Sequence, residues 1–175
     1  QYRDVESLNY YKILLDQGKT KEQALKVLAA RSRDNSRTPM QWSDDKNAGF
    51  TEGTPWIEAP ENYKEINAET ELKDPDSIYS FYKKLIALRK EKDIIAEGTI
   101  EFLEKENADV LAYRRNYQGE ELIVLNNLTA ENVTIRQQPE WKAYQKRLGN
   151  YEKITAEDGK ITLRPFETIV LDSAL

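Results

Sequence analysis

Two short helices are predicted near the start of the chain, because apolar residues recur there every three to four positions. In the first helix these residues are Val5, Leu8, Tyr11, Ile13 and Leu15, followed by Gly18, a residue typical of helix ends. The second helix opens with Thr20 and Gln23, which fit a capping box, and ends near Arg31. These helices carry too few large apolar groups for a core of their own, so they need another element to pack on.

Residues 32–73 lose this periodicity and are predicted to form a long structured loop. Prolines and glycines interrupt the segment at Pro39, Gly49, Gly53, Pro55 and Pro60. Loops of this length are uncommon in compact domains and are often functional. The segment is therefore the first place to look for a site.

The remainder predicts one strong helix followed by an all-β region. Asp74 and Pro75 suit the first positions of a helix with a marked apolar stripe, and after Gly98 the pattern changes to period two. Strands are predicted at Thr99–Leu103, Val110–Tyr117, Leu122–Leu128, Val133–Arg136, Ile161–Leu163 and Thr168–Leu171. Hairpin turns are expected at Gln118-Gly119 and Asp158-Gly159. We place a domain boundary near residue 95.

Composition narrows the chemistry that this chain can perform. Charged residues make up 33% and apolar ones 39%, with a net charge of −5, which is typical of a globular protein and disfavours a nucleic-acid surface. No apolar run approaches the length of a membrane span. Cysteine and histidine are both absent, so disulfides, Cys/His metal sites and imidazole bases are excluded. Acid–base chemistry must rest on carboxylates, and we expect no cofactor or metal.

A motif in the predicted loop is far more specific than these patterns. It reads Ser32-Arg33-Asp34-Asn35-Ser36-Arg37-Thr38-Pro39-Met40-Gln41-Trp42. Further characteristic segments follow at Asn47–Phe50, Gly53–Ile57, Asn62–Asn67, Tyr82–Lys90 and Leu163–Glu167. Together they resemble glycoside hydrolase family thirteen, the α-amylase superfamily, and within it the group of oligo-1,6-glucosidases and trehalose-6-phosphate hydrolases.

The resemblance implies an α+β fragment with a definite organisation. Residues 1–95 would be the last helices and loops of a catalytic (β/α)₈ barrel, and residues 96–175 an antiparallel β-sandwich domain. In this family the nucleophilic Asp, the acid/base Glu and the stabilising Asp lie upstream of the matching segment, and their motifs are not found here. We therefore expect no catalytic residue in this chain and no activity from it alone. Its partner would be the missing amino-terminal part of the barrel, in a bacterial cytoplasmic enzyme without membrane or nucleic-acid partners.

The resemblance also implies a substrate-binding role for two arginines. In the family the first arginine of the motif enters the sugar pocket, so that role falls on Arg33, with Arg37 as the second candidate. A guanidinium offers a rigid fork of donors that can hold a sugar hydroxyl while pairing with a carboxylate. The alternative for Arg33 is pairing with Asp34 or capping the preceding helix, and for Arg37 it is bracing the loop.

Other polar and aromatic residues are expected to be structural. Trp42, Phe50 and Trp56 could stack on a sugar ring, but packing inside the loop is the favoured interpretation. Asp34 and Asn35 suit bonds to nearby backbone groups. The aromatic residues of the β region favour core packing over a carbohydrate-binding module. Two glycosylation sequons, beginning at Asn127 and Asn132, are interpreted as accidental.

The substrate implied by the resemblance is a small α-glucoside. Residues 2–9 and 32–37 look more like trehalose-6-phosphate hydrolases, since oligo-1,6-glucosidases more often have Ile, Thr and Ala in place of Val5, Ser7 and Ser36. We therefore favour hydrolysis of trehalose 6-phosphate by the parent enzyme. An oligo-1,6-glucosidase or glucan 1,6-α-glucosidase is the alternative, and the chain on its own could be a noncatalytic structural or weak sugar-binding module.

Overall fold

The computed structural model describes residues 2–173 and divides the chain into two compact units, residues 1–77 and 78–175. No helix among the described residues is long and apolar enough to cross a membrane.

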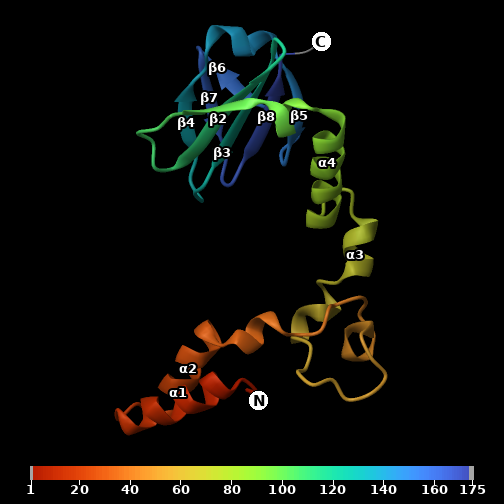
Figure 1. The fold of residues 1–175 in the computed structure, drawn as a ribbon, viewed down its shortest axis with the longest axis vertical. Helices are drawn as coiled ribbons and strands as arrows, with labels where there is room; N and C mark the ends of the chain where they lie inside the picture. Colours follow the sequence, from red (N-terminus) through yellow and green to blue (C-terminus); the bar gives the residue numbers. More distant parts are fainter. Residues whose placement is uncertain (1, 174–175) are drawn as a thin grey trace. The chain divides into compact units, whose positions relative to one another are not determined.

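A helical hairpin opens the first unit, with α1 (Val5–Asp16) and α2 (Lys21–Arg31) in contact along their sides (Figure 1). The turn between them depends on Gly18, whose φ of 83° lets the Lys19 amide bond the Leu14 carbonyl at 3.0 Å. The predicted capping box of Thr20 and Gln23 is confirmed, with reciprocal bonds of 3.0 and 3.2 Å. The hairpin thus has a fixed, tight bend.

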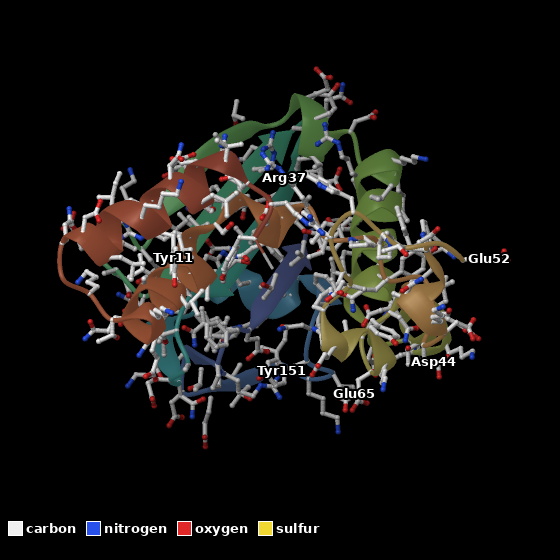
Figure 2. All side chains as sticks on the ribbon, turned by 90° about the horizontal axis from the view of Figure 1, so that it is seen from below. Tyr11, Arg37, Asp44, Glu52, Glu65 and Tyr151 are labelled. Atoms are coloured by element: carbon white, nitrogen blue, oxygen red, sulfur yellow. The ribbon has the colours of Figure 1, made fainter. Side chains whose placement is uncertain are left out.

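The segment after α2 is mostly irregular, as predicted, but it contains short helices. Three 3₁₀ turns, η1 (Arg33–Ser36), η2 (Lys46–Gly49) and η3 (Glu61–Lys64), precede the helix α3 (Ala68–Lys73). The prediction missed α3 because it is short and has no apolar stripe, with Asn67 as its cap. Several charged side chains of this segment, including the labelled Asp44, Glu52 and Glu65, are exposed (Figure 2).

The strong helix of the second unit begins later than predicted. α4 spans Ile78–Glu91 and is followed by the short α5 (Ile94–Glu97). The prediction that Asp74 caps this helix with Pro75 in its first turn is wrong. Asp74 instead accepts a bond from the Asp76 amide at 2.8 Å, an Asx turn that delays the helix.

After α5 the described chain holds eight antiparallel strands in two sheets and a fourth 3₁₀ turn, η4 (Pro139–Ala143), which contains Trp141 (Figure 1). Their bounds are β1 Thr99–Leu103, β2 Val110–Tyr117, β3 Glu120–Asn127, β4 Val133–Arg136, β5 Gln145–Gly149, β6 Thr155–Glu157, β7 Lys160–Leu163 and β8 Thr168–Asp172. One sheet has the order β1-β2-β3-β8-β5 and the other β4-β7-β6. The predicted antiparallel β-domain is confirmed; the barrel assignment of the first residues stays a prediction.

Both predicted hairpin turns are present, whereas two of the strands were not predicted. Gln118 and Gly119 have φ values of 49° and 86°, and Asp158 and Gly159 have 50° and 70°, which makes both predicted hairpin turns left-handed at both central positions. The missed strands, β5 and β6, lie at sheet edges, where alternation of apolar and polar residues is weak.

The main core lies between the two sheets. Ile123 and Leu125 of β3 and Ile169 and Leu171 of β8 meet Ile161 of β7 in one cluster in which each is at most 2% exposed. Trp141 and further residues of β2, β4 and β7 complete it. Burying a large apolar side chain contributes roughly 1.5–3 kcal/mol, so this cluster is the main source of stability in the domain.

A second cluster covers the outer face of the five-stranded sheet. Leu122 of β3, Leu148 of β5 and Val170 of β8 point to this face, where Ile94 is fully buried and Leu85 of α4 packs. The large sheet is therefore apolar on both faces, and α4 and α5 supply the layer that one face needs.

An ion-pair group around the buried Asp172 reinforces this attachment beyond the end of α4. Lys92 Nζ lies 2.5 Å from Glu120 and 2.9 Å from Asp172, and Arg147 lies 2.7 Å from the same Asp172 carboxylate, which is fully buried. The bonds to Glu120 and Asp172 raise the pKa of Lys92, so the ammonium stays charged. Two cations thus compensate the carboxylate that terminates β8.

The packing of α4 predicts the smallest part of this unit that folds alone. A segment of residues 78–175 should unfold cooperatively, whereas residues 96–175 should lose stability because Leu122 and Val170 become exposed. Chemical denaturation and the dispersion of amide NMR signals compare the two. Equal stability of both segments would contradict this prediction and favour the boundary predicted near residue 95.

Candidate functional site

The helical hairpin brings the start of α1 beside the end of α2, where the specific motif begins. The hydroxyl groups of Ser7 and Ser32 lie 2.8 Å apart in the interior, although 25 residues separate them. Ser32 ends α2 and accepts a bond from the Asp34 amide at 3.2 Å, which starts the turn η1. The motif residues Arg33 to Arg37 are thereby held against residues 3–7.

Asp34 ties this turn to the backbone that precedes α1. Its Oδ2 atom accepts bonds from the amides of Arg3 and Asp4, at 2.6 and 2.9 Å, and the residue is 5% exposed. Its Oδ1 atom accepts no hydrogen bond within residues 2–173 and lies 3.6 Å from Arg37 Nη1. Asp34 was expected to bond nearby backbone, but its backbone partners are about thirty residues away in sequence. Asn35 behaves as predicted, donating to the Ala29 carbonyl at 2.8 Å.

Asp4 is the centre of the charged cluster. Its Oδ2 atom caps α1 by accepting from the Ser7 amide at 3.1 Å, and its Oδ1 atom faces two guanidinium groups. Arg33 Nη2 lies 2.9 Å from Oδ1 and Arg37 Nη1 lies 3.2 Å from it. Asp4 was not predicted to be part of the site. Its position just before an apolar helix indicates a cap but does not reveal the arginine contacts.

Asp4 is held in its ionised form. Burial favours the protonated state, but hydrogen bonds from Ser7, Arg33 and Arg37 outweigh it and keep the pKa of this carboxyl below its ordinary value. A carboxylate saturated in this way is a poor proton donor at neutral pH. The cluster is therefore suited to holding arginines in place.

The two predicted arginines occupy different surroundings. The Arg33 side chain is 56% exposed and also contacts the exposed Glu6 at 3.1 Å. The Arg37 side chain, labelled in Figure 2, is 38% exposed and bridges Asp4 and Asp34. Arg33 lines a cleft of about 910 Å³ and Arg37 is not among its lining residues. The cleft lies between the two helices, with Asn9, Tyr10 and Arg31 among its other polar walls.

The aromatic residues of the long segment do not form the predicted internal core. Trp42, Phe50 and Trp56 are 53%, 51% and 63% exposed. The compact part of this segment is a left-handed turn in which Asn47, Ala48 and Gly49 all have positive φ, from 56° to 64°. The buried Ala48 accepts from the Trp42 amide at 2.8 Å, so backbone bonds replace the expected aromatic packing.

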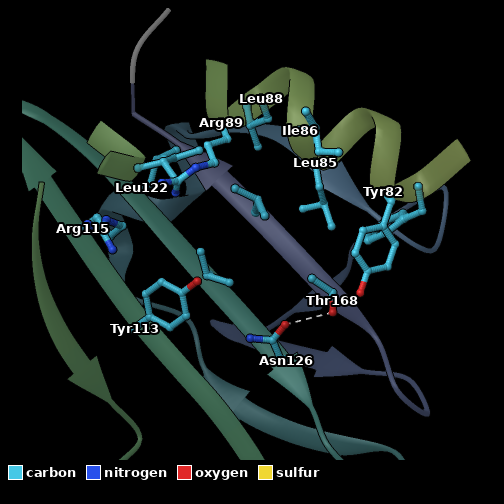
Figure 3. A pocket seen from close by; sticks show the side chains of 14 residues that line it. Tyr82, Leu85, Ile86, Leu88, Arg89, Tyr113, Arg115, Leu122, Asn126 and Thr168 are labelled. Carbon is cyan, nitrogen blue, oxygen red and sulfur yellow. Dashed lines mark hydrogen bonds between the residues drawn. The ribbon is translucent and has the colours of Figure 1, made fainter. Parts of the chain in front are cut away.

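The second unit has a groove of about 480 Å³ between α4 and the five-stranded sheet (Figure 3). Its wall is mostly apolar, with the Thr168 hydroxyl bonded to Asn126 at 2.9 Å at one end. Arg115 at the other end donates to the carbonyls of Ile94 and Gly98 and so secures α5. None of the described residues that line the groove carries a carboxylate, and the groove is a weaker candidate than the cleft beside Arg33.

The remaining predictions for the β-domain agree with structural roles. Trp141 is buried in the core, and Arg164 lies 4.0 Å above the Tyr151 ring. Asn127 of the first sequon is 3% exposed and its amide bonds the carbonyls of Glu131 and Arg164. A glycan on this side chain would disrupt these bonds, whereas Asn132 of the second sequon is exposed.

Comparison with known proteins assigns these residues to a family. Residues 4–98, more than half of the chain, match the model of the alpha amylase catalytic domain. The chain belongs to the alpha-amylase family. Residues 110–170 match the alpha-amylase SusG C-terminal domain. Both arginines and their carboxylate partners lie inside the catalytic-domain match.

Individual relatives in this family are similar over nearly all of the chain. It is 46% identical to the trehalose-6-phosphate hydrolase of Bacillus subtilis (strain 168), covering 97% of the chain and 31% of the relative. It is 42% identical to the oligo-1,6-glucosidase of Parageobacillus thermoglucosidasius, with the same coverage. The crystal structure of Bacillus licheniformis trehalose-6-phosphate hydrolase superposes with a TM-score of 0.90 at 44% identity, covering 98% of the chain and 32% of that structure. The chain thus spans about a third of these relatives.

The contacts of Asp34 predict a measurable effect on the start of the chain. Asp34→Asn removes the charge that accepts the Arg3 and Asp4 amides, and should lower the free energy of unfolding by about 1–3 kcal/mol. Hydrogen exchange of those two amides should accelerate. The exposed Asp44→Asn serves as the control and should change stability by less than about 0.5 kcal/mol. Unchanged exchange at Arg3 and Asp4 would show that this carboxylate does not hold the backbone.

Proposed function

We propose that this chain is the carboxyl-terminal part of a retaining α-glucosidase that hydrolyses trehalose 6-phosphate to glucose and glucose 6-phosphate. The observation that carries the proposal is the 46% identity to a trehalose-6-phosphate hydrolase over 97% of the chain. The motif with Arg33 lies in this shared region. The resemblance to bacterial enzymes carries the further proposal of a cytoplasmic location.

Retaining hydrolysis requires two carboxyl groups roughly 5–5.5 Å apart, one as nucleophile and one as acid and base. The resemblance assigns both groups to the part of the relatives that this chain does not cover. The carboxylates of the arginine cluster have structural roles, since Asp4 caps a helix and Asp34 accepts hydrogen bonds from backbone amides. We therefore propose that the chain supplies a substrate ligand and that the chain alone is inactive.

Arg33 is the proposed sugar ligand, and Arg37 the weaker candidate. The exposed guanidinium of Arg33 lines the cleft and pairs with Asp4 through its Nη2 atom. Its other N–H groups are left as donors for a sugar hydroxyl. Arg37 bridges two buried carboxylates and lies outside the cleft lining, which favours the bracing alternative.

The exposed side of α4 supports its assignment to a barrel that continues beyond this chain. Ile78, Tyr82 and Ile86 recur every four residues and are 73%, 62% and 53% exposed. Leu85 and Leu88 face the sheet of the same unit. Tyr82 and Ile86 also line the groove beside that sheet, so the apolar stripe of α4 is one broad face that the sheet covers only in part. The uncovered part is suited to pack on another layer. The proposed second layer is the rest of the barrel.

Two of the three residues that favour trehalose 6-phosphate contact the arginine cluster, while the third, Val5, is 68% exposed. Ser7 bonds Ser32 and Asp4, and Ser36 donates to the Arg33 carbonyl at 2.9 Å. They adjust the shape around Arg33, and residues for the phosphate group are proposed to lie in the part of the parent outside this chain. An oligo-1,6-glucosidase is the second candidate, because identity to that group reaches 42%.

Substitution of Arg33 tests the proposed ligand in the full-length parent. Arg33→Ala should lower kcat/KM at least 100-fold, about 2.7 kcal/mol of transition-state stabilisation, because a charged sugar contact is lost. The exposed Lys26→Ala on α2 is the control and should keep wild-type kinetics. Wild-type kinetics for Arg33→Ala would make it a structural brace and leave Arg37 as the candidate.

Substrate preference tests the proposed reaction. Full-length enzyme should show a higher kcat/KM for trehalose 6-phosphate than for isomaltose, and the isolated chain assayed in parallel should show no turnover of either. A preference for isomaltose would replace the narrower assignment with an oligo-1,6-glucosidase. Turnover by the purified chain alone would overturn the assignment of the catalytic carboxylates to the missing part.

A further inference from the structure

Asp4 combines a fixed position with contacts to both candidate arginines. We propose that Asp4 is a positioning residue that orients the Arg33 guanidinium for the sugar. This inference rests on the function proposed above and adds a residue to it.

Asp4 is fixed from three directions before it contacts either arginine. Its amide is held by Asp34 at 2.9 Å, its Oδ2 atom is held by the Ser7 amide at 3.1 Å, and the Ser7 hydroxyl lies 3.2 Å from the same oxygen. The side chain is 5% exposed. These bonds fix the orientation of the carboxylate, and its other oxygen, Oδ1, therefore faces Arg33 and Arg37.

Arg33 needs such an anchor because its side chain is exposed and long. Its other partner, Glu6, has a side chain that is 72% exposed and 3.1 Å away, and exposed pairs of this kind contribute little. Both ion pairs are measured at the Nη2 atom, and no hydrogen bond from Nη1 or Nε is found within residues 2–173. The buried Asp4 thus holds the Nη2 end of the guanidinium while other donors stay available to a hydroxyl group.

Arg37 makes this arrangement electrostatically stable. Asp4 and Asp34 are two buried carboxylates bridged by Arg37, at 3.2 and 3.6 Å. A buried carboxylate without a cation is costly, so Arg37 compensates the pair and leaves Asp4 able to accept Arg33 as well. Arg37, the second arginine of the motif, therefore supports the carboxylate that holds Arg33 and does not itself bind the sugar in this proposal.

The test is a double-mutant cycle in the full-length parent with trehalose 6-phosphate as substrate. Asp4→Asn keeps the cap, because Asn is as good as Asp at that position, but removes the charge that Arg33 contacts. Asp4→Asn should lower kcat/KM roughly 10- to 100-fold through misplacement of the ligand. Combined with Arg33→Ala, it should cause no loss beyond that of Arg33→Ala alone, because Asp4 acts through Arg33.

Two comparisons separate positioning from a general loss of structure. Glu6→Gln removes the exposed partner of Arg33 and should lower kcat/KM less than about threefold. NMR of the unsubstituted enzyme should show slower guanidinium rotation for Arg33 than for Arg31, which lines the same cleft. This last measurement decides even if Asp4→Asn does not fold, since equal rotation would overturn the proposal.

The outcomes distinguish this inference from the function on which it rests. Wild-type kinetics for Arg33→Ala would remove the proposed sugar ligand itself, and the role of Asp4 with it. A loss for Arg33→Ala with no loss for Asp4→Asn would overturn the positioning role alone. Losses that multiply in the double variant would also overturn it, because they would show that Asp4 acts independently of Arg33.

Discussion

A carboxylate taken out of water must be given donors and compensating charge, and this constraint organises the first unit of the protein. Asp34 obtains its donors from the backbone before α1, and Asp4 obtains them from the start of α1 and from two arginines. Each carboxylate can be buried only when the two segments meet. The hairpin, the turn η1 and the arginine cluster are therefore one interdependent arrangement.

The second unit satisfies a different constraint, which is the burial of both faces of a sheet. The three-stranded sheet covers one face and α4 with α5 covers the other. The family comparison places residues 78–98 with the catalytic domain, whereas the packing places them with the β-domain. The boundary of the family match and the boundary of packing therefore lie at different places in this chain.

Local patterns predicted the elements well, whereas contacts between distant residues were beyond them. The capping box of Thr20 and the left-handed turn at Gln118 depend on a few adjacent residues, so their sequence signals were sufficient. The role of Asp4 depends on Arg33, about thirty positions away, and no periodicity records such a pair. Trp42 was predicted to be buried because large aromatic residues usually are, but it is exposed. Backbone hydrogen bonds to Ala48 hold this part of the chain instead. The arginines themselves were found only through the family motif.

The strand order has a consequence for how this protein is made. β8 lies between β3 and β5 in the five-stranded sheet, yet it follows both in the sequence. During synthesis, β3 and β5 therefore emerge from the ribosome before the strand that joins them, and the fully buried Asp172 arrives with that strand. Until then β5 has no neighbour in its sheet. The five-stranded sheet is therefore completed late in synthesis. Before β8 is added, the unpaired edges of β3 and β5 are exposed to aggregation.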